Sequence, residues 1–231
     1  MPGNTTYQQI PAVLSRLTAL KALRIYFNNE WRNRISRDLE ETLSIFSRGD
    51  HSTIVGTLSP AHSTLEVLQF GVSLGYSHDT RAYLDWVQPA DTFTSFKCLR
   101  LLVISQEGLV GTASNTMKHP TALLPQSLEA LRIFYPRYSL YDWIELIAPC
   151  REQLPNLRLL QLYIFNGRGD LFEKLRYTNS YYRTKKALGS IGTQFRLGCS
   201  TDIAREEWKD ENYDPCTSDL VEFLESLDVQ A

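Results

Sequence analysis

The sequence lacks the features that would place it in several common functional classes. Its 231 residues include no apolar run approaching the roughly 18 residues that a membrane-spanning helix needs. The formal net charge of -2 leaves no excess of basic residues, which a general binder of nucleic acid or membrane surfaces requires. The N-terminus has neither the positive start nor the apolar core of a secretory signal. We therefore expect no nucleic-acid partner, no membrane partner and a cytoplasmic or nuclear location.

Metal ligands and catalytic motifs are also scarce. The four cysteines form no C-x-x-C pair, and the four histidines lie far apart in the sequence. No G-x-S-x-G motif and no complete glycine-rich phosphate loop occurs. Cys98 and Cys150 have apolar sequence neighbours, so each is expected to be a small buried hydrophobe. The chain is therefore predicted to hold no metal, to need no cofactor and to have no catalytic residues.

A leucine pattern recurs through the chain. In LPNLRLLQLYI, residues 154–164, the leucines are spaced by three, three and then two residues, which fits neither a helix nor a strand alone. The last two apolar residues would face one side of a short strand, and the leucine before them would come from the turn that leads in. Five copies share this frame. Their aligned leucines are Leu23, Leu68, Leu102, Leu131 and Leu160.

The spacing of these copies predicts a repeat architecture. Successive aligned leucines are 45, 34, 29 and 29 residues apart, and the last two gaps lie at the upper edge of the roughly 20–29-residue period of leucine-rich repeats. Each copy has only a few apolar side chains, which it cannot bury by itself, so neighbouring copies must stack. A sixth strand is expected around Phe195 and Leu197. We predict an α/β fold, an irregular leucine-rich repeat solenoid with a curved parallel sheet and convex helices and loops.

Segments between the copies predict the convex layer. Residues 31–46 have apolar side chains at helical spacing. Ser139 and Asp142 resemble a capping box, which would open a helix that closes near Pro149. Another helix is expected over residues 170–182. The outer layer is therefore predicted to be partly helical.

Other segments are expected to be loops or a cap. Residues 71–79 and 107–120 are rich in Gly, Ser and Asn, which favours loops. A helix is expected from Thr217 to Leu227, and it would cap the last repeat. We predict one domain over residues 1–231, with repeats at about 14–200 and a C-terminal helical cap at about 201–231.

The strand residues that alternate with the buried positions are candidates for binding. They should line the exposed face of the sheet in two rows. The first row is Arg24, Gln69, Val103, Arg132 and Gln161, and the second is Tyr26, Gly71, Ser105, Phe134 and Tyr163. Arginine and aromatic side chains are favoured at protein interfaces, so we predict that a protein partner binds this concave face. The predicted partner-binding residues are Arg24, Tyr26, Gln69, Arg132, Phe134, Gln161 and Tyr163. The alternative is that Tyr and Phe are simply good strand residues and that an exposed Arg needs no partner.

One copy matches the leucine-rich repeat consensus in full, as Leu20-x-x-Leu23-x-Ile25-x-x-Asn28. With the later copies, residues 14–165 resemble the C-terminal region of fungal leucine-rich-repeat proteins that often carry an F-box. The resemblance implies that an F-box recruits a ubiquitin ligase through its adaptor subunit, while the repeats hold the protein to be degraded. Residues 1–13 are too short for an F-box of roughly 45 residues, so only the recognition half is carried over.

We therefore predict a non-catalytic module for protein–protein recognition, which would serve as the substrate-recognition part of a ubiquitin ligase assembly. One alternative is an enzyme of unknown class with its site in the insertions. Another is a truncated repeat fragment that self-associates through its N-terminal edge strand, around Arg24 and Tyr26.

Overall fold

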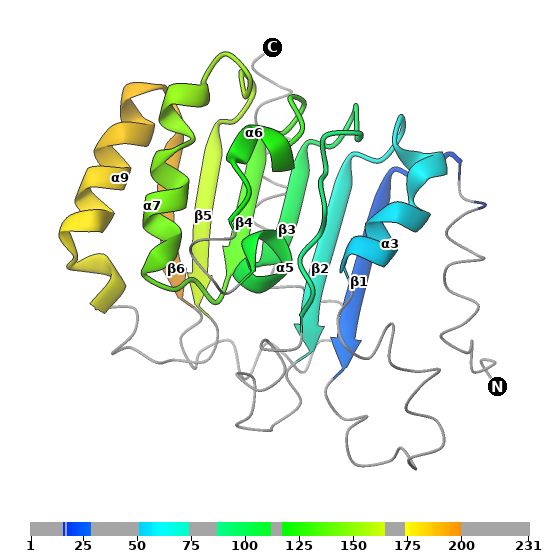
Figure 1. Ribbon diagram of the computed structural model, residues 1–231, viewed down its shortest axis with the longest axis horizontal. Coiled ribbons are helices and arrows are strands. Elements are labelled where there is room, and N and C mark those ends of the chain that lie inside the picture. The colour runs from blue at the N-terminus through cyan, green and yellow to red at the C-terminus, as the bar shows by residue number, and fades with distance from the viewer. Residues whose placement is uncertain are drawn as a thin grey trace.

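The computed structural model describes residues 16, 18–28, 51–73, 87–111, 117–164 and 174–199. Its centre is a six-stranded sheet in which every strand is parallel to its neighbours and the strands follow chain order (Figure 1). The strands are β1 (Ala22–Asn28), β2 (Val67–Ser73), β3 (Leu101–Ser105), β4 (Ala130–Phe134), β5 (Leu159–Ile164) and β6 (Gln194–Cys199). The predicted α/β class and the sixth strand are confirmed.

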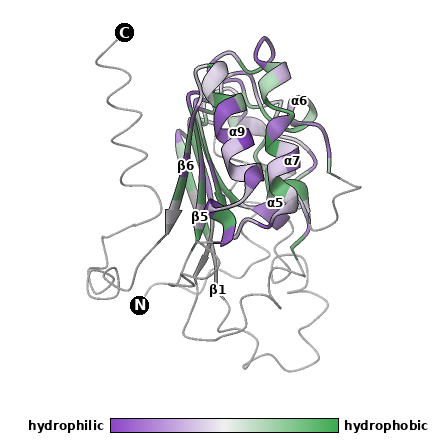
Figure 2. Ribbon diagram, turned by 90° about the vertical axis from the view of Figure 1, so that its left-hand side faces the viewer, coloured by the Kyte–Doolittle hydropathy of each residue, from purple (hydrophilic) through white to green (hydrophobic). Residues whose placement is uncertain are grey.

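The described helices form one layer against the sheet. They are α3 (His51–Thr57), α5 (Gln106–Val110), α6 (Pro120–Leu123), α7 (Ser139–Glu145) and α9 (Asn179–Ser190), with short 3-10 turns η3 (Ser59–Ala61) and η5 (Ala148–Cys150). Figure 2 shows α5, α6, α7 and α9 on the same side of the strands. None of the helices in the described part of the chain is long and apolar enough to cross a membrane.

The strand register confirms the leucine frame. The aligned positions occupy one row across the sheet, which runs through Leu23, Leu68, Leu102, Leu131, Leu160 and Phe195. From Leu68 to Leu160 the side chains in this row are 0% exposed. A register slip of one residue would turn each of these leucines to the other face of the sheet, so burial of this row fixes how the strands pair.

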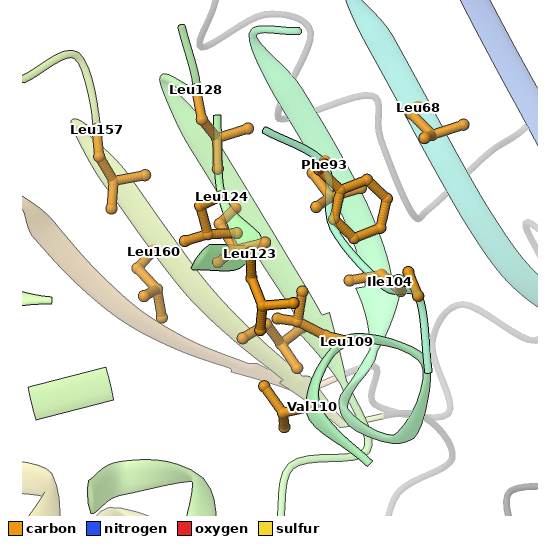
Figure 3. Close-up of a cluster of buried hydrophobic side chains, with 14 of the residues drawn as sticks. Leu68, Phe93, Ile104, Leu109, Val110, Leu123, Leu124, Leu128, Leu157 and Leu160 are labelled. Atoms are coloured by element: carbon orange, nitrogen blue, oxygen red, sulfur yellow. The ribbon is translucent and has the colours of Figure 1, made fainter. Parts of the chain in front are cut away.

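The core lies between this row and the helical layer. Figure 3 shows Leu68, Ile104 and Leu160 on the strands and Leu109 and Leu123 among the side chains above them. These residues belong to one buried cluster that continues through the repeats. Because each strand contributes only a few apolar side chains to this face, the cluster becomes a core only when neighbouring units are stacked.

Charged residues two positions before the aligned leucines alternate in sign. They are Lys21, Glu66, Arg100, Glu129 and Arg158. The Nζ atom of Lys21 lies 3.2 Å from Oε1 of Glu66, and Nε of Arg100 lies 2.7 Å from Oε1 of Glu129. The Lys21–Glu66 pair is the more exposed, whereas the side chains of Arg100 and Glu129 are only 25% and 18% exposed. Exposed ion pairs typically contribute about 0–1 kcal/mol each, but an alternating row favours the observed order of neighbours. The pattern is visible in the sequence, yet the leucine spacing alone does not reveal it.

Small polar side chains also link each turn to the repeat before it. Each donates a hydrogen bond to a backbone carbonyl of the preceding unit: Thr64 Oγ1 to Leu20 (3.1 Å), Cys98 Sγ to Ser63 (3.0 Å), Ser127 Oγ to Leu99 (2.9 Å) and Asn156 Nδ2 to Gln126 (3.0 Å). This role corrects one prediction. Cys98 is exposed rather than buried, because it lies on the turn, whereas Cys150 is buried as expected.

Two of the predicted helices differ from the sequence interpretation. The helix at residues 139–145 is confirmed, but its N-cap is Tyr138 and makes no side-chain capping bond, so the capping box at Ser139 is wrong. The single helix expected over 170–182 is also wrong. The described part begins with a helical turn at 174–176, and α9 starts separately because Thr178 Oγ1 accepts a hydrogen bond from Tyr181 N at 3.1 Å.

Short helices occur within the predicted loop 107–120. The helix α5 follows β3 directly, because Ser105 Oγ accepts a hydrogen bond from Gly108 N at 3.1 Å and acts as N-cap. It ends at Gly111, whose φ of 76° places it in the left-handed region that glycine adopts readily. Pro120 then opens α6. These cues were local, and the polar composition of the segment obscured them.

Three predicted segments lie largely or wholly outside the described residues: the helix at 31–46, most of the loop at 71–79 and the C-terminal cap at 201–231. The loop segment overlaps the described chain only at residues 71–73, which belong to β2.

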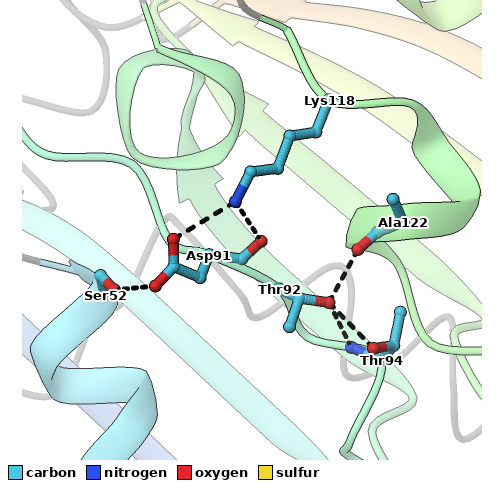
Figure 4. A network of polar contacts seen from close by, with 6 residues as sticks. All are labelled: Ser52, Asp91, Thr92, Thr94, Lys118 and Ala122. Atoms are coloured by element: carbon cyan, nitrogen blue, oxygen red, sulfur yellow. Dashed lines mark hydrogen bonds and ion pairs between the residues drawn. The ribbon is translucent and has the colours of Figure 1, made fainter.

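A polar network joins α3 to the loops before α6 (Figure 4). Ser52 Oγ donates to Asp91 Oδ2 at 2.7 Å, and Lys118 Nζ donates to Asp91 Oδ1 at 3.2 Å. The Ser52 bond is the largest cause of a lowered pKa for the Asp91 carboxyl, followed by the bond and charge of Lys118. The network therefore connects three crossovers through one ionised carboxylate.

The aligned leucines should dominate the stability of the fold. We expect Leu131→Ala or Leu160→Ala to lower the free energy of unfolding by about 2–5 kcal/mol, because each removes most of a wholly buried leucine side chain from the shared core. Urea unfolding followed by circular dichroism measures the loss. Leu146→Ala is the matched control, since Leu146 is 43% exposed and its truncation should change little. Neutral results at both buried positions would contradict the shared core.

The Asp91 network gives a prediction about pH. The folded state lowers the pKa of Asp91, so its contribution to stability is present above the ordinary Asp pKa and is lost as the pH falls through the lowered value. Ser52→Ala should raise the pKa of Asp91 toward its ordinary value, as measured by NMR titration of the carboxyl carbon. Thr94→Ala is the control, because Thr94 bonds Thr92 and not Asp91. An unchanged pKa in the Ser52 variant would exclude that hydrogen bond.

Candidate functional site

The two predicted binding rows are aligned across the sheet as the leucine frame implied. Arg24 pairs with Gln69, and the row continues through Val103, Arg132 and Gln161. It then ends on β6, where Gln161 pairs with Arg196. The side chains of this row alternate with the aligned leucines, so they lie on the sheet face opposite the helices, which we call the helix-free face.

The predicted exposure of this face is wrong. Gln69, Val103 and Arg132 are 0% exposed, while Phe134, Ser105 and Gln161 are 2%, 3% and 5% exposed. Tyr163 is half-buried. For Arg24 and Tyr26 the structure describes the strand positions but not the side chains, and for Gly71 it describes the strand position but not the burial.

The helix-free face carries a second buried apolar cluster. It consists of Leu101, Val103, Ala130, Phe134 and Leu159. Every residue of β3 and β4 is buried. Parallel strands that are covered on both faces have nearly continuous apolar sequences rather than alternating ones, and LLVIS in β3 has that form. The solenoid interpretation assigned only one face to the core and therefore missed the second cluster.

Arg132 is the main polar group in this apolar setting. Its Nε and one terminal nitrogen both donate to Gln161 Oε1, at 3.1 Å and 2.7 Å. The central carbon of the guanidinium lies 5.0 Å from the centre of the Tyr163 ring, a distance typical of a cation–π contact. Gln161 is the direct cross-strand neighbour of Arg132. The register of β4 and β5 thus holds the guanidinium in place.

The aromatic side chains beside Arg132 are positioned by their neighbours. The rings of Phe134 and Tyr163 meet edge to face, with their centres 6.0 Å apart. On β6, a Cβ at Gly198 would lie 2.9 Å from the Tyr163 ring and 3.0 Å from Gln161 Nε2. Gly198 therefore leaves the space that the Tyr163 ring occupies, and a larger residue there would force the ring to move.

The chemistry of this arrangement is suited to binding. Arginine keeps its charge in proteins, and its planar fork matches a carboxylate. A buried charge is stabilised by the hydrogen bonds and charges that surround it. With apolar side chains around it, Arg132 is suited to a segment that presents apolar residues and at least one carboxylate. No group of three or more His, Cys, Asp or Glu in the described ranges could hold a metal ion.

A second polar cluster, absent from the sequence interpretation, follows β3. Gln106 Oε1 accepts a hydrogen bond from Arg137 N at 2.7 Å, and Glu107 Oε1 lies 3.1 Å from a terminal nitrogen of Arg137. Glu107 is 0% exposed and stands at the repeat position where the first copy has Asn28. These contacts attach the loop after β4 to the preceding repeat, so we assign them a structural role.

The imidazole of His51 is packed beside this cluster. Its ring centre lies 4.6 Å from that of Phe70, and the side chain is 2% exposed. A Cβ at Gly108 would lie 2.8 Å from His51 Nε2. The ring therefore fits closely against the backbone of α5, which explains why glycine stands in a helix there.

The helical layer also exposes large apolar side chains. They belong to residues on or beside α7 and α9: Tyr138, Leu146, Tyr177 and Tyr182. Between these helices, Arg183 Nε donates to Glu145 Oε1 at 2.6 Å. Exposed aromatic and apolar side chains are typical of protein interfaces.

No protein-family model, curated protein or solved structure matches this chain. The site is therefore assigned from its geometry alone.

The close fit of His51 against α5 can be tested with two glycines. Gly108→Ala should lower the free energy of unfolding by about 1–3 kcal/mol, because the new methyl group would overlap a buried ring. Gly56→Ala is the matched control in another helix, where nothing lies within 4 Å of the added Cβ. It should raise stability by up to about 1 kcal/mol. Equal effects in urea unfolding would contradict the packing described here.

Proposed function

We propose that this chain is a non-catalytic protein-recognition module and that its binding surface is the helix-free face of the sheet. We further propose that the sheet and its helices form an irregular leucine-rich repeat solenoid. The module would hold a protein segment rather than a small molecule, because the face extends across several strands. A role in presenting substrates to a ubiquitin ligase, in the cytoplasm or nucleus, follows from the resemblance of the repeats and is part of the same proposal.

The observation that supports this function is Arg132 within the second apolar cluster. A core that serves stability alone gains little from a buried charge, because well-packed apolar residues of similar volume are often equally or more stabilising. Here the guanidinium is fully buried, is oriented by Gln161 and is stacked on Tyr163. Buried ionic groups can instead select a particular partner or register. Arg132 therefore supports recognition of an acidic, apolar segment.

The burial of this face defines how binding would occur. Side chains that are 0–5% exposed do not meet a partner in solution, so a partner must replace whatever covers them. Binding would then be a competition, and the apparent affinity for a partner would be lower than the intrinsic affinity of the open face.

A second candidate surface is the helical layer, because it exposes the large side chains of Tyr138, Leu146, Tyr177 and Tyr182. Tyr177 and Tyr182 are 66% and 56% exposed, so they could meet a partner without rearrangement. The two surfaces lie on different layers of the protein, which allows a single experiment to separate them.

We would select ligands from a displayed library of helical peptides that carry apolar residues and carboxylates. For ligands of the helix-free face, Tyr163→Ala and Arg132→Lys should each weaken binding at least about tenfold, the second because lysine lacks the planar fork. Fluorescence anisotropy with labelled peptides measures the affinities. Circular dichroism would verify that both variants remain folded.

Tyr182→Ala is the matched control, since it removes an exposed tyrosine from the helical layer. It should leave the affinity unchanged. Ligands that lose binding in the Tyr182 variant, but not in the Tyr163 or Arg132 variants, would move the recognition surface to the helical layer and refute the proposed face.

A further inference from the structure

The burial of the helix-free face has a defined outline. One row across the sheet runs through Ala22, Val67, Leu101, Ala130, Leu159 and Gln194. The three central side chains of this row are 0% exposed, Val67 is half-buried, and the residues at both ends are exposed. The covered area is therefore centred on β3, β4 and β5, and it fades toward both edges of the sheet.

The covered area has the dimensions of one helix. Three strands spaced at about 4.8 Å are some 10–15 Å wide, and a helix with its side chains is about 10–12 Å across. Among the described residues, no helix lies on this side of the sheet (Figure 2). Burial of these side chains nevertheless requires atoms packed over them.

We propose that the chain's own C-terminal segment, residues 217–231, occupies the helix-free face as a built-in ligand. This inference rests on the proposed function, because it names the occupant of the same binding surface. The segment lies outside the described residues, and its sequence is TSDLVEFLESLDVQA.

The apolar pattern of the segment complements the second cluster. Leu220, Phe223, Leu224 and Leu227 recur at helical spacing and form one apolar stripe. Over residues 217–227 a helix would be about 16 Å long, which matches the five-residue strands β3 and β4 at about 3.3 Å per residue. The stripe would lie against Leu101, Ala130 and Leu159.

The charge of the segment complements Arg132. Residues 217–231 include the four acids Asp219, Glu222, Glu225 and Asp228, and no Lys or Arg. Arg132 is fully buried, and a guanidinium forms strong, charge-assisted hydrogen bonds with a carboxylate. Asp219 and Asp228 border the apolar stripe on a helical projection, so each would lie at the edge of the contact.

The connection is long enough. The last described strand ends at Cys199, at the edge of the sheet, and residues 200–216 lead to the segment. Extended, they would reach more than about 50 Å, which exceeds the distance needed to turn back along β6 and cross to β4.

Cross-linking in the full-length chain tests the occupant directly. The native cysteines would be replaced, and Ala130→Cys would be combined in turn with a cysteine at Leu220, Phe223, Leu224 or Leu227. We expect a short thiol cross-linker to join at least one of these pairs within one chain about tenfold faster than control pairs. The controls combine the same C-terminal positions with Ala61→Cys, because Ala61 is also 0% exposed but lies in the core beneath the helices. Mass mapping of the joined peptides identifies the products.

Three outcomes would overturn the inference. The first is that no pair within one chain is cross-linked faster than the controls. The second is that cross-links form only between two chains, which would make a second copy of the chain the occupant. The third is that the pairs with Ala130→Cys and the pairs with Ala61→Cys are cross-linked at equal rates. A second variant supplies an independent test. Leu224→Asp should tighten binding of the selected peptide ligands about tenfold, because it weakens their resident competitor.

The two proposals fail in distinguishable ways. In the first case the cysteine pairs are cross-linked, but no selected peptide depends on Tyr163 for binding. That result would support the C-terminal segment as occupant and reject the recognition function. Peptide binding at Tyr163 without cross-linking, and with no effect of Leu224→Asp, would retain the recognition face and reject the C-terminal segment as its occupant.

Discussion

The structure depends on one constraint, which is that no repeat can bury its own leucines. A strand such as β4 presents Leu131 and Ile133 to the helical side, where the matching residues of β3 and β5 and the helical layer bury them. Parallel pairing without a register shift is the arrangement that keeps these rows continuous. The parallel strand order follows from that requirement.

Weaker interactions refine this arrangement. The alternating charges from Lys21 to Glu129 and the side-chain bonds of Thr64, Ser127 and Asn156 each connect neighbouring units. They lie in the turns before the strands, where solvent reduces what each contributes. Their value lies in specificity, since each bond forms only when the correct neighbour is in place. Apolar burial provides most of the stability, and the polar rows select the register.

Burial of both faces distinguishes this sheet from a one-sided repeat sheet. Once Leu101, Ala130 and Leu159 are covered, the face that would meet a partner belongs to a second core. Within this second core Gln161 and Tyr163 hold Arg132 in a fixed orientation. The proposed recognition of an acidic, apolar segment would combine a specific ionic contact with tolerant apolar contacts.

Leucine spacing alone was sufficient to predict the strands, their parallel order and the residues that share a row, because period-2 alternation and repeat length are properties of the chain itself. Local cues for α5, such as Ser105 and Gly111, were present in the sequence but weak beside its polar composition. Burial of Arg132, Phe134 and Gln161 could not be read from the sequence, because it depends on what packs across β3–β5 and no spacing within a strand records that. The contacts of Glu107 with Arg137 and of His51 with Gly108 likewise join residues far apart in the chain, so they exist only once the repeats are stacked.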